Sequence, residues 1–518
     1  MTKSCIITCF PDQNKDREFI FKQIINELKV SSKRIAHWEI VRRSIDSRKG
    51  RPKVRLKIEV YIDEQPQPEK KYSAKLKKAT NKKVLIVGAG PAGYFAALKL
   101  LEVGIRPIIL DRGKDVRARR KDLRNLQQES IIDPHSNYCF GEGGAGTYSD
   151  GKLYTRSKKR GNIKEVLKIL VEHGASEEIL IDAHPHIGSN RLPKVIESIR
   201  KNILSFGGEV LFEHFVNDII IKNGRFCGLR VNGNKEITGD NLILATGHSA
   251  RDIYEMFHNK GLLLESKPFA MGVRLEHPQA LIDEIQYRQK PREEMLPAAR
   301  YAMNCQIKNK GIFSFCMCPG GFIVPAATAP GEIVINGMSL SKRDSPYANA
   351  GIVATIDGKD YGHFAKHGAL AGLYFQSSIE KKVFLNNDNA MQNAPAQRMM
   401  DFINGKFSNT LPDTSYIPGI YSERLDQLLP VNIAEPLKQG LKVFGKKMKH
   451  YMTNEAKLLA IESRTSSPVR IPRDTLSLEH PQIKGLFPCG EGAGYAGGIM
   501  SAAIDGQKVA NKISEKLN

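Results

Sequence analysis

Long apolar runs are missing from this sequence of 518 residues, because none reaches the roughly 18 residues that a membrane-spanning helix needs. Met1 to Phe10 contain no basic leader followed by an apolar stretch, so we expect no signal peptide. The eight cysteines are scattered, apart from Cys316 and Cys318, and their spacing indicates no disulfide framework. These absences make a reducing cytoplasm the expected compartment. A metal site at Cys316 and Cys318 would need two further ligands, and no His or Cys pair near them in the sequence offers these.

The sequence also has few acidic residues relative to basic ones. The net charge is +23, and residues 1–83 alone carry 22 Lys and Arg against 10 Asp and Glu, which is about half of the excess. A basic surface attracts nucleic acid, anionic membranes or acidic substrates. No signature of a nucleic-acid module accompanies the charge, which favours a solvated basic face and leaves an RNA partner as an alternative.

The first 64 residues have a pattern of their own. Alternating apolar residues predict strands at 4–10, 37–41 and 54–60, and helical spacing predicts a helix at 15–29. This β-α-β-β order predicts a small basic N-terminal domain of ferredoxin-like type over residues 1–64. Residues 65–83, rich in Pro and Lys, are expected to form an exposed linker.

A strand, glycine loop, helix and second strand follow the linker. The loop is Gly88-Ala-Gly90-Pro-Ala-Gly93, the strands are expected at 83–87 and 107–110, and Asp111 ends the second one. In this context the three glycines allow a tight turn, approach of a pyrophosphate and close packing of helix on strand. The helix N-terminus offers free N–H groups to the phosphates, and Asp111 can accept hydrogen bonds from the ribose. The candidate cofactor-binding residues of this unit are Gly88, Ala89, Gly90, Pro91, Ala92, Gly93, Asp111 and Arg112.

Two further glycine clusters have a different context. Gly141 to Gly146 follow no clear strand, and we interpret Gly143 and Gly144 as a backbone nest for an anion or a flavin ring. Gly492 to Gly497 lie between a strand at 483–489 and a helix at 499–515, which suits the element that closes the domain. That helix N-terminus, with Gly498 and Ile499, would stabilise the negative charge of a reduced flavin. Further candidates are Thr246, Gly247, Gly490 and Glu491, and Glu491 either bonds the ribityl chain or caps the helix.

Several segments resemble a known group of proteins. Residues 88–93, 245–247 and 489–498 resemble the two-dinucleotide-binding flavoprotein superfamily. Residues 42–48, 140–152, 315–321, 336–339 and 462–470 resemble, more narrowly, a bacterial family of FAD-dependent dehydrogenases. The resemblance covers nearly the whole chain and implies FAD as cofactor and oxidoreductase activity, without naming a substrate. Many relatives have Glu in place of Asp111, and both side chains can bond a ribose diol.

We therefore expect an α/β protein with a Rossmann-type FAD-binding domain. Its first part covers 84–264 and its C-terminal return 456–518. Residues 265–455 carry no nucleotide fingerprint and are expected to form an inserted α+β substrate or cap domain.

Three groups of residues are candidates for catalysis. Cys316 and Cys318 could relay electrons as a dithiol, although the turn expected at Pro319 to Gly321 favours thiols that only pack. His184 and His186 could offer a base to the substrate, or form part of a structural loop. Arg464, with Arg470, could hold a substrate carboxylate or phosphate, or form ion pairs.

Three functions fit these patterns. The first is an FAD-dependent oxidoreductase that passes a hydride between flavin N5 and a small organic substrate, with NAD(P)H as a candidate electron partner. A second complete nucleotide-binding fingerprint is absent, so the sequence does not specify NAD(P)H. The alternatives are an FAD-containing RNA-modifying or RNA-binding protein that uses the basic N-terminal domain, and a redox-regulated binding protein with structural FAD. The sequence indicates neither the direction of electron flow nor the oligomeric state.

Overall fold

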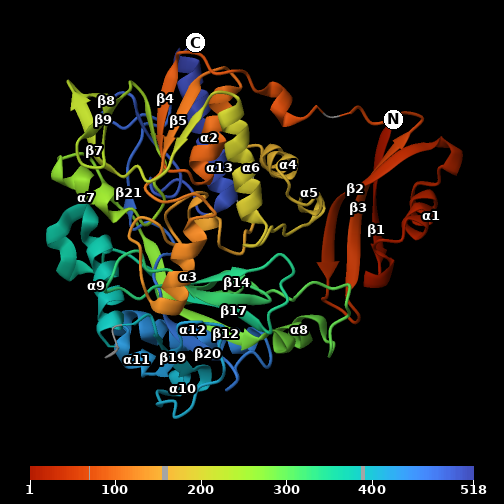
Figure 1. Ribbon diagram of the computed structural model, residues 1–518. Helices are drawn as coiled ribbons and strands as arrows, with labels where there is room; N and C mark the ends of the chain where they lie inside the picture. The colour runs from red at the N-terminus through yellow and green to blue at the C-terminus, as the bar shows by residue number, and fades with distance from the viewer. Residues whose placement is uncertain (69, 155–160, 387–390, 518) are drawn as a thin grey trace.

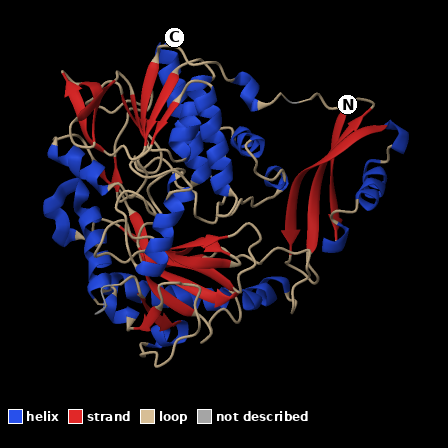
Figure 2. Cartoon of the chain, in the orientation of Figure 1, coloured by secondary structure: helices blue, strands red, loops and turns tan. Residues whose placement is uncertain are grey.

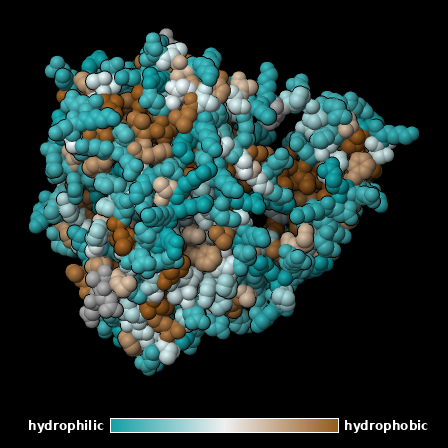
Figure 3. Space-filling view, viewed as in Figure 1, coloured by the Kyte–Doolittle hydropathy of each residue, from teal (hydrophilic) through white to brown (hydrophobic). Residues whose placement is uncertain are grey.

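A computed structural model describes residues 1–68, 70–154, 161–386 and 391–517. The fold has three units with separate sheets, and the chain returns to the second unit after the third. Figures 1 and 2 show the small N-terminal unit projecting from a larger body. On the face drawn in Figure 3 the surface is mostly hydrophilic, with a notch between this unit and the body. Within the described ranges, no helix combines the length and the apolar character that crossing a bilayer requires.

The N-terminal unit is a three-stranded antiparallel sheet with one helix. Its elements are β1 (Thr2–Cys9), α1 (Arg17–Leu28), β2 (Ile35–Asp46) and β3 (Lys53–Ile62), and β3 lies between β1 and β2. In β3 the buried Val54, Leu56 and Ile58 alternate with exposed basic residues, because successive side chains of a strand point to opposite faces. The helix covers the apolar face on the side turned away from the body (Figure 1), which confirms the β-α-β-β prediction.

The second unit contains a five-stranded parallel sheet in the order β22-β10-β4-β5-β6. The strands are β4 (Lys83–Val87), β5 (Arg106–Leu110), β6 (Glu209–Leu211), β10 (Leu242–Leu244) and β22 (Leu486–Pro488). Helices of this unit are α2 (Pro91–Leu101), α3 (Arg119–Glu129), α4 (Ile163–Glu172), α5 (Glu178–Ile181), α6 (Leu192–Ser205), α7 (Arg251–Asn259) and α13 (Ile499–Leu517). A small antiparallel sheet of β7 (Val216–Lys222), β8 (Arg225–Val231) and β9 (Lys235–Thr238) packs on the opposite face.

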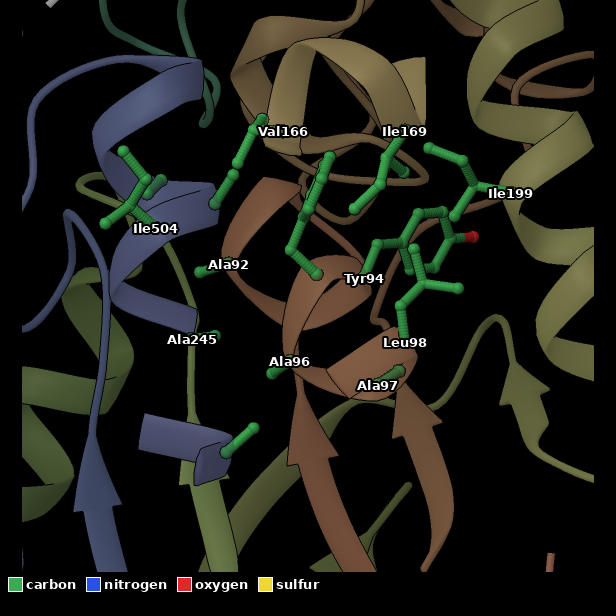
Figure 4. Packing of buried hydrophobic residues seen from close by; sticks show 14 of the residues in the cluster. Ala92, Tyr94, Ala96, Ala97, Leu98, Val166, Ile169, Ile199, Ala245 and Ile504 are labelled. Carbon is green, nitrogen blue, oxygen red and sulfur yellow. The ribbon is translucent and has the colours of Figure 1, made fainter. Parts of the chain in front are cut away.

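Helix α2 lies in the centre of the largest apolar core. Figure 4 shows its residues Tyr94 and Leu98 packed among Val166 and Ile169 of α4, Ile199 of α6 and Ile504 of α13. Because the C-terminal helix α13 packs beside α2, the two ends of the Rossmann-type unit are joined in one core. The parallel sheet with its helices confirms the fold class predicted from the glycine-loop unit.

The third unit is a seven-stranded sheet in the order β13-β14-β17-β12-β20-β18-β19. Its strands are β12 (Phe269–Pro278), β13 (Asn304–Ile307), β14 (Lys310–Cys318), β17 (Tyr347–Ile356), β18 (Ala394–Arg398), β19 (Ile420–Ser422) and β20 (Lys457–Glu462). Two-stranded sheets pair β11 (Glu265–Ser266) with β21 (Val469–Arg470) and β15 (Gly321–Pro325) with β16 (Ile335–Ser339). The helices are α8 (Gln279–Tyr287), α9 (Ala371–Leu385), α10 (Met399–Asn404), α11 (Leu425–Leu428) and α12 (Val431–Lys447).

Two boundaries of the structure differ from those expected. β20 pairs with β12 and β18, so residues 457–462 belong to the seven-stranded sheet and not to the return of the FAD-binding unit. In the stretch expected to be an exposed linker, Tyr72 and Leu76 are 5% and 8% exposed and join the core around α2. The hydroxyl of Tyr72 also donates to Glu102 at 2.7 Å. Apolar side chains too few to give a periodic pattern therefore anchor this segment to the body.

Candidate functional site

One cavity of about 410 Å³ joins the parallel sheet to the third unit. It lies at the carboxyl ends of β4, β5 and β10, where open parallel sheets bind their ligands. Twelve of the sixteen candidate cofactor-binding residues line it: Gly88, Gly90, Pro91, Ala92, Asp111, Arg112, Gly144, Thr246, Gly247, Glu491, Gly498 and Ile499. The other four candidates do not line the cavity; they are Ala89, Gly93, Gly143 and Gly490. Their contacts are with the loops and helices directly behind the cavity wall.

The glycine loop leaves room at its centre and none at its ends. A Cβ on Gly88 would lie 2.3 Å from the Ala245 carbonyl oxygen, and one on Gly93 2.0 Å from the Gly88 carbonyl oxygen. A Cβ on Gly90, in contrast, would have no heavy atom nearer than the Gly144 Cα at 3.9 Å. Gly88 and Gly93 are therefore needed for the turn and for helix packing, and Gly90 keeps the cavity open next to the first turn of α2.

Asp111 ties the loops of the cavity together. One carboxylate oxygen accepts from the Ala89 N–H at 2.8 Å, and the other accepts from the N–H groups of Gly113 and Gly141 at 2.9 and 3.1 Å. Since each carboxylate oxygen has two lone pairs, the Ala89-bonded oxygen retains one for a ribose hydroxyl. The neighbouring Arg112 pairs with Asp252 at 2.5 Å, and its guanidinium lies over the rings of Phe140 and Phe215.

The second glycine cluster lies directly against the first. The N–H of Gly143 donates to the Ala89 carbonyl at 2.9 Å, and its φ of 78° is in the left-handed region that favours glycine. Gly144, Ala145 and Gly146 then form part of the cavity wall. The cluster is thus a loop of the dinucleotide cavity and not a second Rossmann unit, as its sequence context predicts.

The C-terminal loop before α13 closes the cavity from the other side. The Glu491 carboxylate accepts from the N–H of Gly498, which agrees with the helix-capping alternative for this residue. The N–H of Gly490 donates to Asp505 of α13 at 2.8 Å, so Gly490 fixes the loop to the helix. Helix α13 begins at Ile499, and its first-turn N–H groups lack intrahelical acceptors and point out of the helix end at the cavity wall.

These features fit an FAD molecule in the cavity. The first turns of α2 and α13 would supply N–H groups and positive partial charge to its phosphates and to a flavin that gains electrons. The space at Gly90 is next to the N-terminus of α2, where a pyrophosphate would lie, and any side chain there would fill it. The chemistry that FAD supplies when bound is two-electron transfer through its ring.

Polar and aromatic groups of both units also line the cavity. Phe315, Cys316 and Asn336 come from the third unit, Lys152, Tyr154 and His248 come from the second, and together they form a polar wall. The His248 ring nitrogen Nδ1 is 2.8 Å from Ser249 Oγ, and Nε2 is 4.0 Å from a Glu491 oxygen. Burial lowers the pKa of His248, against the attraction of Glu491, so the ring is neutral at neutral pH.

Sequence patterns did not single out His248 and Lys152. His248 directly follows Ala245-Thr-Gly247, so its place after a strand of the parallel sheet was a usable signal. Lys152 has no such signal, because its contacts are with Cys316 and Cys318, more than 160 positions along the chain.

Cys316 and Cys318 lie at the end of β14, where the sequence favoured a turn. Pro319 follows the strand, so the turn begins one residue later than the pair. The pairing with β17 shifts between Phe315 and Cys318, and this bulge places Cys316 on the cavity wall with Cys318 fully buried behind it.

The two candidate histidines lie outside this wall. His186 Nε2 is 3.2 Å from the Ser341 carbonyl oxygen, and the ring of His184 packs on Tyr154 with centroids 5.2 Å apart. Burial is the largest cause that lowers the pKa of each to about 4. The structure therefore supports the alternative in which both belong to a structural loop.

Arg464 lines the cavity, but its guanidinium is occupied. It pairs with Glu332 at 2.7 Å and Glu380 at 2.9 Å, and Arg251 pairs with the same two carboxylates. The guanidinium of Arg464 therefore points into a buried cluster of ion pairs. This geometry favours the ion-pair alternative over binding of a substrate carboxylate by Arg464. Arg470 is 42% exposed and lies 3.5 Å from Glu265.

Three family models match parts of the chain. Residues 82–300 match the family model described as pyridine nucleotide-disulphide oxidoreductase, and 268–465 match that of an FAD-dependent protein, C-terminal domain-like. Residues 1–61 match a domain of unknown function. Among solved structures, FqzB is 13% identical and aligns over 86% of this chain and 79% of its own, with a TM-score of 0.37. CtdE in complex with FAD is 12% identical over 83% and 84% of the two chains, with a TM-score of 0.32.

Two relatives are similar in sequence. The thiamine thiazole synthase of Aeropyrum pernix is 25% identical over 194 residues, which is 35% of this chain and 59% of that protein. An uncharacterized protein of Clostridium beijerinckii is 39% identical over 524 residues, 97% of each chain. The two family models place the chain in a bacterial family of FAD-dependent oxidoreductases within the two-dinucleotide-binding flavoprotein superfamily, and the Clostridium protein is a full-length relative of it.

Proposed function

We propose that FAD lies along this cavity and exchanges a hydride with a small organic substrate at the end formed by the third unit. The pyrophosphate lies at the first turn of α2, and the adenosine lies toward Asp111 and Arg112. The flavin ring then lies toward Lys152 and Cys316. The observation that carries the proposal is that one continuous cavity joins the glycine loop to this polar wall.

Residues of the chain have clear tasks in this arrangement. Phe315 and Tyr154 offer aromatic surface to the substrate, and Asn336 and Lys152 offer hydrogen-bond donors. His248 is a neutral acid or base on the wall, held in orientation by Ser249. A group of this kind accelerates proton transfer by about 10²–10⁴-fold when it reaches the substrate.

The test is reoxidation of the bound flavin under argon. After photoreduction, the protein is mixed with NAD⁺, NADP⁺ and small compounds that contain activated C=C, C=O or C=N bonds. We expect at least one to reoxidise the bound flavin more than about tenfold faster than free reduced FAD, and His248→Gln to slow that reaction by about 10²-fold. His184→Gln is the matched control, with no effect. Equal rates for bound and free flavin with every compound would contradict hydride exchange at this wall.

The pH profile of that reaction gives a second readout. In this direction the acceptor takes up a proton with the hydride, so His248 would act as the acid and its protonated form would be the active one; burial lowers its pKa. The rate should therefore rise as pH falls and become largest only below the ordinary histidine range of about 6.5. His248→Gln should lose this pH dependence.

RNA binding is a second candidate, favoured by the open face of the N-terminal sheet. Lys53, Arg55 and Lys57 of β3 are exposed on the face opposite α1. Phosphate contacts on such a face would make tRNA binding fall steeply with salt.

A truncation separates the two candidates. A protein of residues 70–518 keeps the buried Tyr72 and Leu76. It loses the hydrogen bond from the Ala183 N–H to the Arg43 carbonyl and ion pairs such as Arg43–Asp182 and Arg51–Glu293, each worth about 1 kcal/mol. It should bind FAD as the full chain does and lose any salt-dependent tRNA shift. The control of residues 79–518 lacks both anchors and should be less stable by about 3 kcal/mol or more. A folded 70–518 protein without FAD affinity would show that the N-terminal unit completes the site.

A further inference from the structure

The proposed function gives the Cys316 and Cys318 thiols no chemical role, yet both residues are in unusual positions. Cys316 lines the dinucleotide cavity, and Cys318 is 0% exposed directly behind it. The φ of Cys316 is 43°, in the left-handed region. A residue other than glycine held there costs about 1 kcal/mol or more, and such residues cluster at functional sites.

The two thiols lie close together at the bulge, because the Cys318 thiol donates toward Cys316, with Sγ 3.3 Å from the Cys316 carbonyl oxygen and a hydrogen bond to its sulfur. Cα atoms two residues apart in a fully extended strand are about 6.6 Å apart, and a bend shortens this distance. A disulfide needs Cα atoms about 4.4–6.8 Å apart. The bulge between Phe315 and Cys318 bends the strand between the thiols, and Lys152 Nζ lies within 4 Å of both sulfur atoms, at 3.7 and 3.9 Å. The pair can therefore close to a disulfide with little movement.

Two cations face the pair. Besides Lys152, Arg274 lies 3.5 Å from Cys318 Sγ and donates to the Cys316 carbonyl at 2.7 Å. Hydrogen bonding from the Cys318 thiol is the largest cause that lowers the pKa of Cys316, and Lys152 and Arg274 lower it further against desolvation. The pKa of Cys318 is raised, because it is the donor and is fully buried. Proton loss is therefore easier at Cys316 on the cavity wall than at Cys318 behind it.

The surrounding network holds this arrangement rigidly. Arg274 is 0% exposed, pairs with Glu462 at 2.7 Å and donates to Asn349 at 2.9 Å. A Cβ on Gly337 would lie 2.0 Å from an Arg274 nitrogen, so glycine is required there to admit the guanidinium. The carbonyl of Cys316 is thus fixed from behind by a buried arginine, which keeps the bulge in place.

We propose that Cys316 and Cys318 form a redox-active dithiol that exchanges two electrons with FAD in the same cavity. In the oxidising direction the Cys316 thiolate and the Cys318 thiol form one S–S bond. Two electrons and the Cys318 proton pass to oxidised FAD, which becomes the reduced anion, and charge is balanced. In the reverse direction, reduced FAD breaks the disulfide. The proposal rests on FAD lying in this cavity, as in the proposed function, and does not depend on the small organic substrate.

Anaerobic reductive titration with dithionite tests this directly. The air-oxidised full chain should consume about four electrons per FAD, two for the flavin and two for the disulfide. Cys316→Ser and Cys318→Ser should each consume about two. Cys305→Ser, on the neighbouring strand β13, is the matched control and should still consume about four. About two electrons in the full chain would overturn the proposal.

Mass spectrometry after alkylation gives a readout that needs no variant and no bound flavin. In the oxidised protein the peptide with both cysteines should resist iodoacetamide and be lighter by two hydrogens, and after reduction it should be alkylated. Lys152→Met should slow alkylation of Cys316 in the reduced protein by up to about tenfold at pH values below its pKa, since there one pKa unit changes the thiolate fraction tenfold. Free thiols in the oxidised protein would overturn the dithiol. A protein without flavin absorbance would instead reject the placement of FAD and leave the thiol result readable.

Discussion

Replacing Gly90 with valine should remove FAD from the protein and leave the fold intact. Gly90 has φ −79° and ψ −174°, extended backbone that valine adopts without strain. Its added side chain would meet no protein atom closer than 3.9 Å at Cβ, but it would occupy the space next to the N-terminus of α2. We expect FAD affinity to fall at least about hundredfold, or ~2.8 kcal/mol, in an equilibrium titration.

Gly93→Val is the matched control for this result. A Cβ at Gly93 would lie 2.0 Å from the Gly88 carbonyl oxygen, so α2 could not pack on β4 and the variant should fail to fold. The unfolding midpoint of Gly90→Val should equal that of FAD-free wild type. Normal FAD content in Gly90→Val would show that the pyrophosphate lies elsewhere.

Replacing Arg464 with methionine should destabilise the FAD-free protein by about 3–5 kcal/mol. Arg464 is 6% exposed and pairs with the buried Glu332 and Glu380. Its removal leaves two carboxylates with Arg251 as their remaining partner in this cluster. Urea unfolding without FAD measures the loss, because binding effects at the cavity wall are then absent. The exposed Arg470→Met should cost at most about 1 kcal/mol.

The pH dependence of that stability identifies its cause. Burial alone would raise the pKa of Glu380, but Arg251 and Arg464 lower it to about 2. A lowered folded-state pKa gives stability that is complete above the unfolded value of about 4.3 and is lost as pH falls toward 2. In Arg464→Met this acid-dependent part should shrink. Equal stability of the two proteins at pH 7 would contradict a stabilising role for the cluster.

Local patterns predicted the Rossmann-type unit well, because its phosphate loop, flanking strands and closing helix are each contiguous in sequence. The linker was harder, because the two buried side chains that anchor it, Tyr72 and Leu76, are too few to form a periodic pattern, and its other contacts include backbone hydrogen bonds that no sequence pattern reports. The end of the inserted unit was also misplaced, because β20 is defined by pairing with β12, almost two hundred residues earlier. Such long-range pairing has no local signature.

The candidate site divides in the same way. Residues of the glycine loops were found from their spacing, and most of them line the cavity. Lys152 could not be found, because its meaning depends on the bulge in β14 that brings Cys316 to it. The sequence analysis gave Arg464 as a candidate for binding a substrate anion or forming ion pairs. Its partners Glu332 and Glu380 come from distant segments, so the pattern could not show that Arg464 forms ion pairs inside the protein.

The flavin content of the purified protein tests the central claim most directly. We expect a yellow protein that carries about one non-covalent FAD per chain, released on denaturation and identified by mass spectrometry. Protein purified without FAD should take it up with the absorbance shift of a bound flavin. A folded protein that shows no flavin absorbance and takes up no added FAD would contradict the account.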